Sequence, residues 1–150
     1  MRAQERAMQV KDVMVTDVKT IGPAATVQEA AKAMRQFGIG SLIVTEADAL
    51  KGIITDGDVL RKVVAEGKDG AKTAVREVMT KEIVMVEPEM DVQDAVDVMM
   101  EKRIKKLPVV KGSALVGIVT VTDICRVEPR MAEQIGELVF SSASQKRVAG

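Results

Sequence analysis

Two short stretches of the sequence combine residue types that can bind a phosphate and a diol. One is Thr55-Asp56-Gly57-Asp58 and the other is Thr120-Val121-Thr122-Asp123, and each follows an apolar, β-branched run. A Thr at a helix N-cap satisfies one free backbone N–H group, and the remaining free N–H groups and the helix dipole attract an anion. An ionised Asp three residues later only accepts hydrogen bonds, so it can hold the paired hydroxyl groups of a ribose. The pattern outlines a nucleotide site.

The same Thr-x-x-Asp pattern also begins helices that bind nothing. For one isolated copy a plain helix cap is the simpler interpretation, because such caps are a general signature of helix starts. Here the pattern occurs twice, after Gly52-Ile53-Ile54 and after Gly117-Ile118-Val119. The repetition in equivalent places favours a functional role.

The two stretches belong to an internal duplication. Pro23 and Pro88 are separated by 88 − 23 = 65 positions, and many other identical residues keep this difference. Residues 12–61 and 77–126 align without a gap, and 17 of the 50 paired positions are identical. Chance does not explain that agreement, so the chain contains two units of the same structure.

Each copy has the pattern of a β-α-β-β-α unit. In the first copy residues 18–21 alternate as a strand, and a helix from Thr26 to about Phe37 ends at Gly38. The remaining elements are a buried strand at 42–44, a strand at 52–55 and a helix from 56 to about 66. The predicted fold class is α/β (α+β), with the two repeats packed about a pseudo-two-fold axis.

The predicted domain organisation follows the repeats. Residues 10–66 form the first repeat, 67–72 a linker rich in Gly and charge, and 73–127 the second repeat. Residues 128–150 form a short helix behind Pro129 and a polar tail, which we expect to be disordered. The apolar positions of that helix are Met131, Ile135, Leu138 and Val139. This helix packs either on its own module or on a partner subunit.

Composition excludes several classes of protein. Lys plus Arg number 22 and Asp plus Glu number 22, and only two residues are aromatic, so nucleic acid is a disfavoured partner. With no His and one Cys, the chain has neither a structural zinc set nor a nucleophile with a base, and we expect no catalysis. Without an apolar run near 18 residues or a signal peptide, we expect a cytoplasmic protein with no membrane partner.

Apolar residues on several sides of the helices predict a homodimer.

The motifs together resemble a known family. Val-Met near the start of each copy, a Pro before a capped helix and Gly-Ile-(Ile/Val)-Thr-x-x-Asp at the end are similar to a tandem pair of cystathionine-β-synthase (CBS) domains. The second copy is the closer match to the family, because its stretch from Met99 to Val110 looks like the family's segment between the first helix and the second strand. The resemblance covers about Val10 to Val127. It implies a Bateman module that binds AMP, ADP, ATP or S-adenosylmethionine in clefts between the repeats and regulates an effector protein, whose identity stays open.

Carried residue by residue, the resemblance assigns roles within the two clefts. It implies that Thr55 and Thr120 face the phosphate end, while Asp58 and Asp123 hold ribose hydroxyl groups. The residues flanking the adenine or ribose would include Thr16, Val18, Thr20, Lys81 and Ile83, and those lining the clefts would include Ile39, Gly40, Lys105, Lys106 and Pro108.

The two copies differ where the second strand begins. Lys105 and Lys106 can offer ammonium groups to a phosphate, whereas Gly40 and Ser41 cannot. Strand alternation sends the two lysines to opposite faces, so one of them reaches a given phosphate, unless both are solvated charges that guard a strand edge. The sequence predicts an asymmetry between the clefts but not its direction.

Two arginines each follow an Asp of the pattern by three residues. Arg61 and Arg126 can reach a phosphate or form an i, i+3 ion pair with Asp58 and Asp123, and we favour the ion pair. The leading functional hypothesis is a non-catalytic sensor of adenine nucleotides. The alternatives are a dimerisation or scaffold module that needs no ligand, and a sensor of an S-adenosylmethionine-type ligand.

Overall fold

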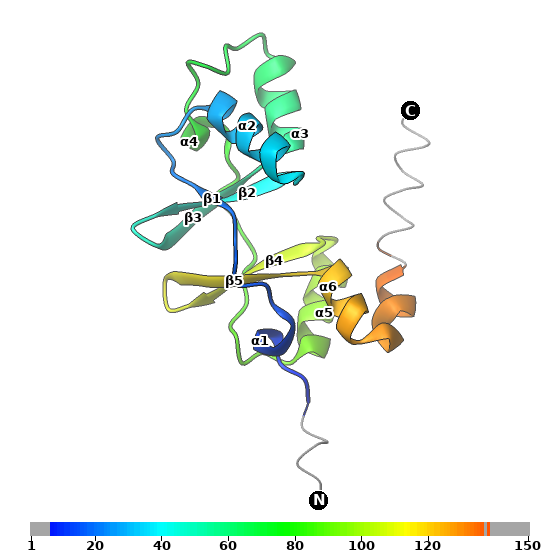
Figure 1. Ribbon diagram of the computed structural model, residues 1–150. Helices are drawn as coiled ribbons and strands as arrows, with labels where there is room; N and C mark the ends of the chain where they lie inside the picture. The colour runs from blue at the N-terminus through cyan, green and yellow to red at the C-terminus, as the bar shows by residue number, and fades with distance from the viewer. Residues whose placement is uncertain (1–6, 137, 139–150) are drawn as a thin grey trace, which may run out of the picture. The chain divides into compact units, whose positions relative to one another are not determined.

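The computed structural model describes residues 7–136 and 138, which are arranged in two compact units (Figure 1). The Asp58 unit consists of Asp17–Val84 and Gly112–Leu115. Among the described residues, the Asp123 unit consists of 7–16, Met85–Lys111, 116–136 and 138. The mixed α+β class predicted from the sequence is confirmed.

The Asp58 unit contains a three-stranded arrangement. Strand β1 (Thr20–Ile21) runs parallel to β2 (Ser41–Glu46), and β2 forms an antiparallel hairpin with β3 (Ala49–Thr55). The predicted buried strand is confirmed, because Leu42, Ile43 and Val44 are each at most 2% exposed. The hairpin ends at Thr55, directly opposite Ser41, so the strand register places the start of β2 beside the first Thr-x-x-Asp stretch.

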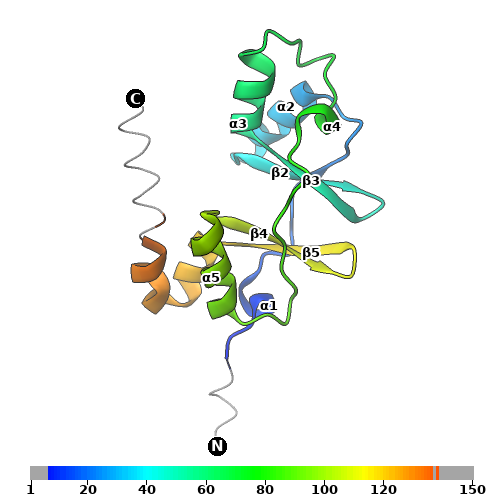
Figure 2. The ribbon, with the colours of Figure 1, turned by 180° about the vertical axis from the view of Figure 1, so that it is seen from behind.

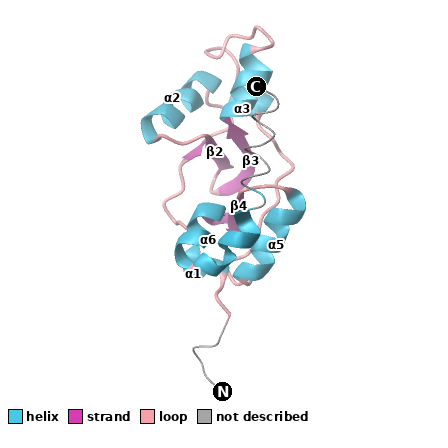
Figure 3. Ribbon diagram, turned by 90° about the vertical axis from the view of Figure 1, so that its right-hand side faces the viewer, coloured by secondary structure: helices cyan, strands magenta, loops and turns pink. Residues whose placement is uncertain are grey.

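Helix α2 (Val27–Phe37) covers one face of this hairpin (Figure 3). The Thr26 hydroxyl accepts a hydrogen bond from the backbone N–H of Glu29, and Gly38 ends the helix with a φ of 63°. Both helix boundaries confirm the sequence prediction, because a capping Thr and a left-handed Gly are strong local signals. Buried side chains of α2 pack in one core with those of the hairpin; they include Val27, Ala30, Met34, Leu42, Val44 and Ile54.

The second helical segment of this unit changes its winding. Helix α3 (Asp56–Val59) continues as a π-helical turn, η2 (Leu60–Val64), and a further short helix, α4 (Val75–Val78), completes the core. Beyond α4, Thr80 and Ile53 exchange two backbone hydrogen bonds of 2.8 and 3.0 Å. The first residues of the second sequence repeat therefore fold onto β3 of the first repeat.

The Asp123 unit repeats this plan with the corresponding exchange (Figure 2). Its elements are α1 (Val10–Val13), α5 (Val92–Lys102), β4 (Lys106–Lys111), most of β5 (Ala114–Thr120), α6 (Val121–Val127) and η3 (Pro129–Met131). Val15 and Ile118 exchange two backbone hydrogen bonds of 2.9 Å. The first residues of the chain therefore fold onto the last strand of the second repeat.

The first predicted strand of the second repeat does not form as a full strand in the structure. The predicted counterpart of β1 is reduced to a single parallel bridge between Val86 and Val109. A backbone hydrogen bond on each side of that bridge, from Val86 to the Pro108 carbonyl and from Val110 to the Val86 carbonyl, holds the segment in place. This short pairing replaces a full strand because Pro108 has no N–H group to extend it.

The predicted C-terminal helix begins with a 3-10 turn at Pro129 and is helical over 132–136. Ile135 and Leu138 are buried, and Gln134 hydrogen-bonds with Gln93 and Asp97 of α5, so the segment packs on the Asp123 unit. Val139 and the polar tail lie outside the described residues. Within the described part of the chain, no helix has the length and apolar character needed to span a bilayer.

Candidate functional site

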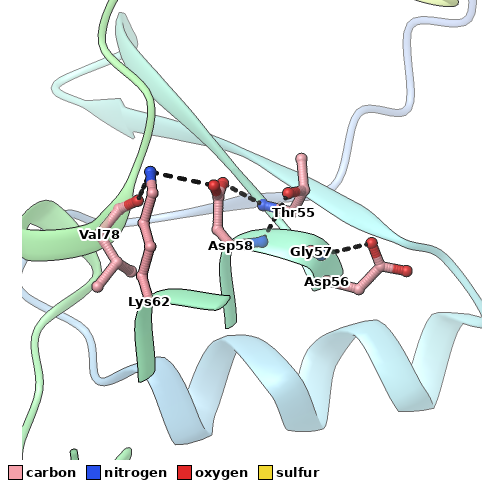
Figure 4. A network of polar contacts seen from close by, with 6 residues as sticks. All are labelled: Thr55, Asp56, Gly57, Asp58, Lys62 and Val78. Carbon is pink, nitrogen blue, oxygen red and sulfur yellow. Dashed lines mark hydrogen bonds and ion pairs between the residues drawn. The ribbon is translucent and has the colours of Figure 1, made fainter. Parts of the chain in front are cut away.

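The first Thr-x-x-Asp stretch forms a closed capping box at the junction of β3 and α3 (Figure 4). The Asp58 N–H donates to the Thr55 hydroxyl at 3.0 Å, and the Thr55 N–H donates to Asp58 Oδ2 at 3.0 Å. Asp56 Oδ1 also accepts a hydrogen bond of 2.8 Å from the Gly57 N–H. The predicted strand-to-helix turn is confirmed, and Asp58 is only 5% exposed within it.

A lysine that the sequence analysis did not single out completes this turn. Lys62 Nζ lies 3.1 Å from Asp58 Oδ1 and donates a hydrogen bond of 3.0 Å to the carbonyl oxygen of Val78, the last residue of α4 (Figure 4). The available signal was the spacing, since an Asp four residues before a Lys is a favourable helix pair. The cation at the end of α4 also satisfies a free carbonyl group there.

The prediction that Arg61 pairs with Asp58 was wrong. The Arg61 guanidinium instead lies beside Gly57, where a Cβ would stand 2.7 Å from Nη2. The π-helical turn of η2 widens the helix at this point, and Lys62 takes the position next to Asp58.

The second Thr-x-x-Asp stretch is built differently. The Asp123 N–H donates to the Thr120 hydroxyl at 3.1 Å, and that hydroxyl donates to Asp123 Oδ2 at 2.8 Å. Arg126 Nη1 lies 3.4 Å from Asp123 Oδ1, so the predicted i, i+3 pair is confirmed in this copy. Val127 occupies the position equivalent to Lys62, since 127 − 62 = 65. The Asp123 side chain is 14% exposed, against 7% for Asp58.

The residues before β2 and β4 adjoin these turns. The Gly40 carbonyl accepts a 2.9 Å hydrogen bond from the Asp56 N–H, and the Lys105 carbonyl accepts one of 3.0 Å from the Val121 N–H. Gly40 lies close to the Asp56 side chain, because a Cβ there would lie 2.9 Å from Asp56 Oδ2 and would require that carboxylate to move. The structure thus brings these two predicted site residues to the start of the helices.

The exchange of starting segments between the repeats determines in which unit two further predicted site residues lie. Lys81 follows Thr80 in the Asp58 unit, and Thr16 follows Val15 in the Asp123 unit. Each therefore adjoins the last strand of the other sequence repeat, an arrangement that periodicity in the sequence does not reveal. Both side chains are exposed.

The other predicted site residues have mixed environments. Thr20 pairs with Ile43 in the parallel ladder and is exposed, while Ile39 packs against the core of the Asp58 unit. Val18 and Ile83 are half-buried in the same unit. In the Asp123 unit, Lys106 is exposed at the first position of β4 and Pro108 is buried.

The Asp58 unit also contains an open cavity of about 410 Å³. Its lining residues are Pro23, Ala24, Glu46, Lys51, Arg76, Met79 and Lys81. Three cationic side chains against one carboxylate favour an anion, but the lining includes neither Thr55 nor Asp58. Among the described residues, no group of three or more His, Cys, Asp or Glu could hold a metal ion.

Comparison with known proteins identifies the family. The family model described as "CBS domain" matches the chain twice, over residues 10–65 and 75–130. The chain belongs to the CBS domain family. The two matched segments agree with the internal duplication, and a CBS domain pair is in general a regulatory module.

Relatives and solved structures support this assignment. The CBS domain-containing protein YhcV of Bacillus subtilis (strain 168) is 44% identical over 115 residues, which make up 77% of this chain and 81% of that protein. A crystal structure of Hypoxic Response Protein I with two coordinated zinc ions has a TM-score of 0.73 and 32% identity, covering 79% of this chain and 98% of that one. The hexameric CBS-CP12 protein from bloom-forming cyanobacteria has a TM-score of 0.70 and 32% identity, covering 96% and 84%.

Proposed function

We propose that this CBS domain pair is a regulatory, non-catalytic module that binds an adenine nucleotide of the AMP, ADP or ATP class at its Thr-x-x-Asp turns. The observation that carries the proposal is the doubled turn itself, in which Thr55 and Thr120 cap helices and present Asp58 and Asp123 beside them. A phosphate suits the free N–H groups near such a start, and a carboxylate suits a ribose diol. S-adenosylmethionine carries the same diol and is the alternative ligand.

The Asp123 turn has the more accessible carboxylate. Its exposed fraction is 14%, and its cationic neighbour Arg126 is 72% exposed at a contact distance of 3.4 Å. Each charge-assisted hydrogen bond to a ribose hydroxyl is worth about 1.5–3 kcal/mol, which corresponds to roughly 10- to 100-fold in affinity. Loss of one aspartate therefore has a measurable effect on binding.

Regulation requires that ligand-bound and ligand-free proteins differ in state. A ligand shifts an equilibrium only through unequal affinity for two states, here two geometries of the module or of its dimer. Self-association is supported by the exposed apolar side chains Leu60 and Val64, which are 61% and 63% exposed and four residues apart on η2. The relative CBS-CP12 is hexameric, and we propose a homodimer for this chain. The effector that reads its state would be a cytoplasmic protein.

Thermal unfolding with added ligand tests the proposal. We expect AMP, ADP, ATP or S-adenosylmethionine, but not GMP, to raise Tm of the full chain. At 100 times Kd one site gains about 2.7 kcal/mol, or roughly 5–10 °C for a domain of this size. The shift should disappear in the double variant Asp58→Ala/Asp123→Ala. The matched control is Glu101→Ala, which removes an exposed carboxylate from α5.

A ligand-independent scaffold is the second candidate, and one observation favours it. Both aspartates already accept hydrogen bonds from their own turns, which is what a purely structural cap requires. This candidate predicts a dimer of unchanged stability with every nucleotide tested. Unchanged Tm values across the whole panel would therefore replace the sensor with the scaffold.

A further inference from the structure

We propose that Lys62 determines which of the two turns is occupied, because it holds Asp58 in a closed state and directs the adenosyl ligand to Asp123 first. The inference rests on the proposed nucleotide binding and adds the direction of the asymmetry between the repeats. Its structural basis is the network formed by Thr55, Asp58, Lys62 and Val78 (Figure 4).

Both carboxylate oxygens of Asp58 are engaged within its own unit. Oδ2 accepts the Thr55 N–H at 3.0 Å, and Oδ1 pairs with Lys62 Nζ at 3.1 Å. The side chain is 7% exposed, so a ligand cannot reach these oxygens without moving a neighbour. A ribose diol needs acceptors on these two oxygens, and because so little of the carboxylate is exposed it competes with Lys62 for access to them.

The Lys62 ammonium has two anchors rather than one. Besides Asp58, it donates to the carbonyl oxygen of Val78 at 3.0 Å. That carbonyl is at the C-terminus of α4, where a cation is favourable and an unpaired oxygen is costly. Displacing Lys62 from Asp58 thus disturbs a contact with α4 as well, and both losses oppose ligand binding at this turn.

The Asp123 turn lacks this closure. Val127 replaces the lysine, and the remaining cation, Arg126, lies at 3.4 Å with 72% of its side chain exposed. An exposed ion pair of this kind contributes little and yields readily to a competing ligand. The chain therefore contains two copies of the same turn, of which a lysine restrains only the Asp58 copy. Changing residues 62 and 127 in turn tests the effect of that lysine within one protein.

Isothermal titration calorimetry with AMP tests the inference on variants that keep one aspartate each. Asp58→Ala retains the Asp123 turn, and Asp123→Ala retains the Asp58 turn. We expect AMP to bind the Asp58→Ala protein at least 10-fold more tightly than the Asp123→Ala protein. Adding Lys62→Met to Asp123→Ala should raise its affinity for AMP about 10-fold, and adding Val127→Lys to Asp58→Ala should lower it. Equal affinities of the two single-aspartate proteins, or an affinity that Lys62→Met leaves unchanged or weakens, would overturn the inference.

Amide hydrogen exchange without ligand separates this inference from the proposed function. The Met79 N–H donates to the Val75 carbonyl at 2.9 Å, and the equivalent Met14 N–H donates to the Val10 carbonyl at 2.9 Å. In Lys62→Met we expect faster exchange at Met79 and no change at Met14, whereas Arg126→Met should change neither amide. Unchanged exchange at Met79 would contradict the role of Lys62. If Met79 exchange is faster but neither the original protein nor any variant binds AMP, ADP, ATP or S-adenosylmethionine, the proposed function fails and the order of occupancy fails with it.

Discussion

Met79 Sδ lies against Gly52, only 2.8 Å from the position that a Cβ on this glycine would take. Met14 Sδ lies in the same way against Gly117, at 2.7 Å. Each methionine belongs to one sequence repeat and each glycine to the other, because the starting segments of the repeats are exchanged. The Gly of the repeated Gly-Ile-(Ile/Val)-Thr motif is therefore required by close packing of the crossing segment, and not by a turn.

The first prediction concerns this close approach. Gly52→Ala should lower the free energy of unfolding by about 1–3 kcal/mol, because the new methyl group meets the Thr80 carbonyl at 2.8 Å as well as the Met79 sulfur. Urea denaturation measures the change. Gly22→Ala is the matched control, since a Cβ at Gly22 has no neighbour within 4 Å. Equal stability of the two variants would contradict the packing role of Gly52.

The second prediction concerns the capping threonines. Thr55→Val removes the hydroxyl that accepts the Asp58 N–H, so the variant should lose about 0.5–2 kcal/mol of stability. Thr55→Ser keeps the acceptor and should remain close to the original protein. Thr122→Val, on the exposed side of α6, controls for the change of residue type. A loss in Thr122→Val as large as that in Thr55→Val would show that the cap contributes nothing specific.

The local structure was more predictable than the tertiary pairing. The boundaries of α2 and the start of α3 follow from Thr caps and Gly38, which act within a few residues of sequence. The exchange of α1 and α4 between the repeats was not predictable, because the 65-residue period is the same whether each starting segment folds on its own repeat or on the other. Tertiary contacts decide between those two arrangements.

In the candidate site, too, the local turns could be predicted from the sequence but a tertiary contact could not. Thr55, Asp58, Thr120 and Asp123 were identified from the repeated pattern, and the structure places each pair in a helix-capping turn. The role of Lys62 was missed, although its four-residue spacing from Asp58 was a local signal, because that role also depends on the Val78 carbonyl, which is 16 residues away in sequence. Helical geometry alone did not favour Lys62 over Arg61 as the partner of Asp58.

The third prediction is a pH effect near the C-terminal turn. A hydrogen bond from Arg130, assisted by its charge, lowers the pKa of Glu128 below the ordinary value of 4.5. Because the folded-state pKa lies below the unfolded one, the pair adds stability above pH 4.5 and loses it as the pH falls through the folded-state value. Carboxyl NMR titration should show the pKa of Glu128 rising in Arg130→Gln. An unchanged Glu128 pKa in that variant would exclude the pair as the cause.

The fourth prediction concerns self-association. If Leu60 and Val64 form the contact of the proposed dimer, the original protein should sediment as a dimer and the double variant Leu60→Ser/Val64→Ser as a monomer at the same concentration. Sedimentation velocity gives the result, and Glu66→Ser serves as the polar control just beyond the same helical segment. An intact dimer in the double variant would place the contact on another surface.

The central claim is that the aspartates of the Thr-x-x-Asp turns bind the ribose hydroxyl groups of an adenine nucleotide. Calorimetric titration of the full chain with AMP and with 2′,3′-dideoxy-AMP tests it most directly. We predict that the dideoxy analogue binds roughly 10- to 100-fold more weakly, and that Asp58→Ala/Asp123→Ala removes this difference. Equal binding of the two nucleotides by the original protein, or a difference that persists in the double variant, would contradict the claim.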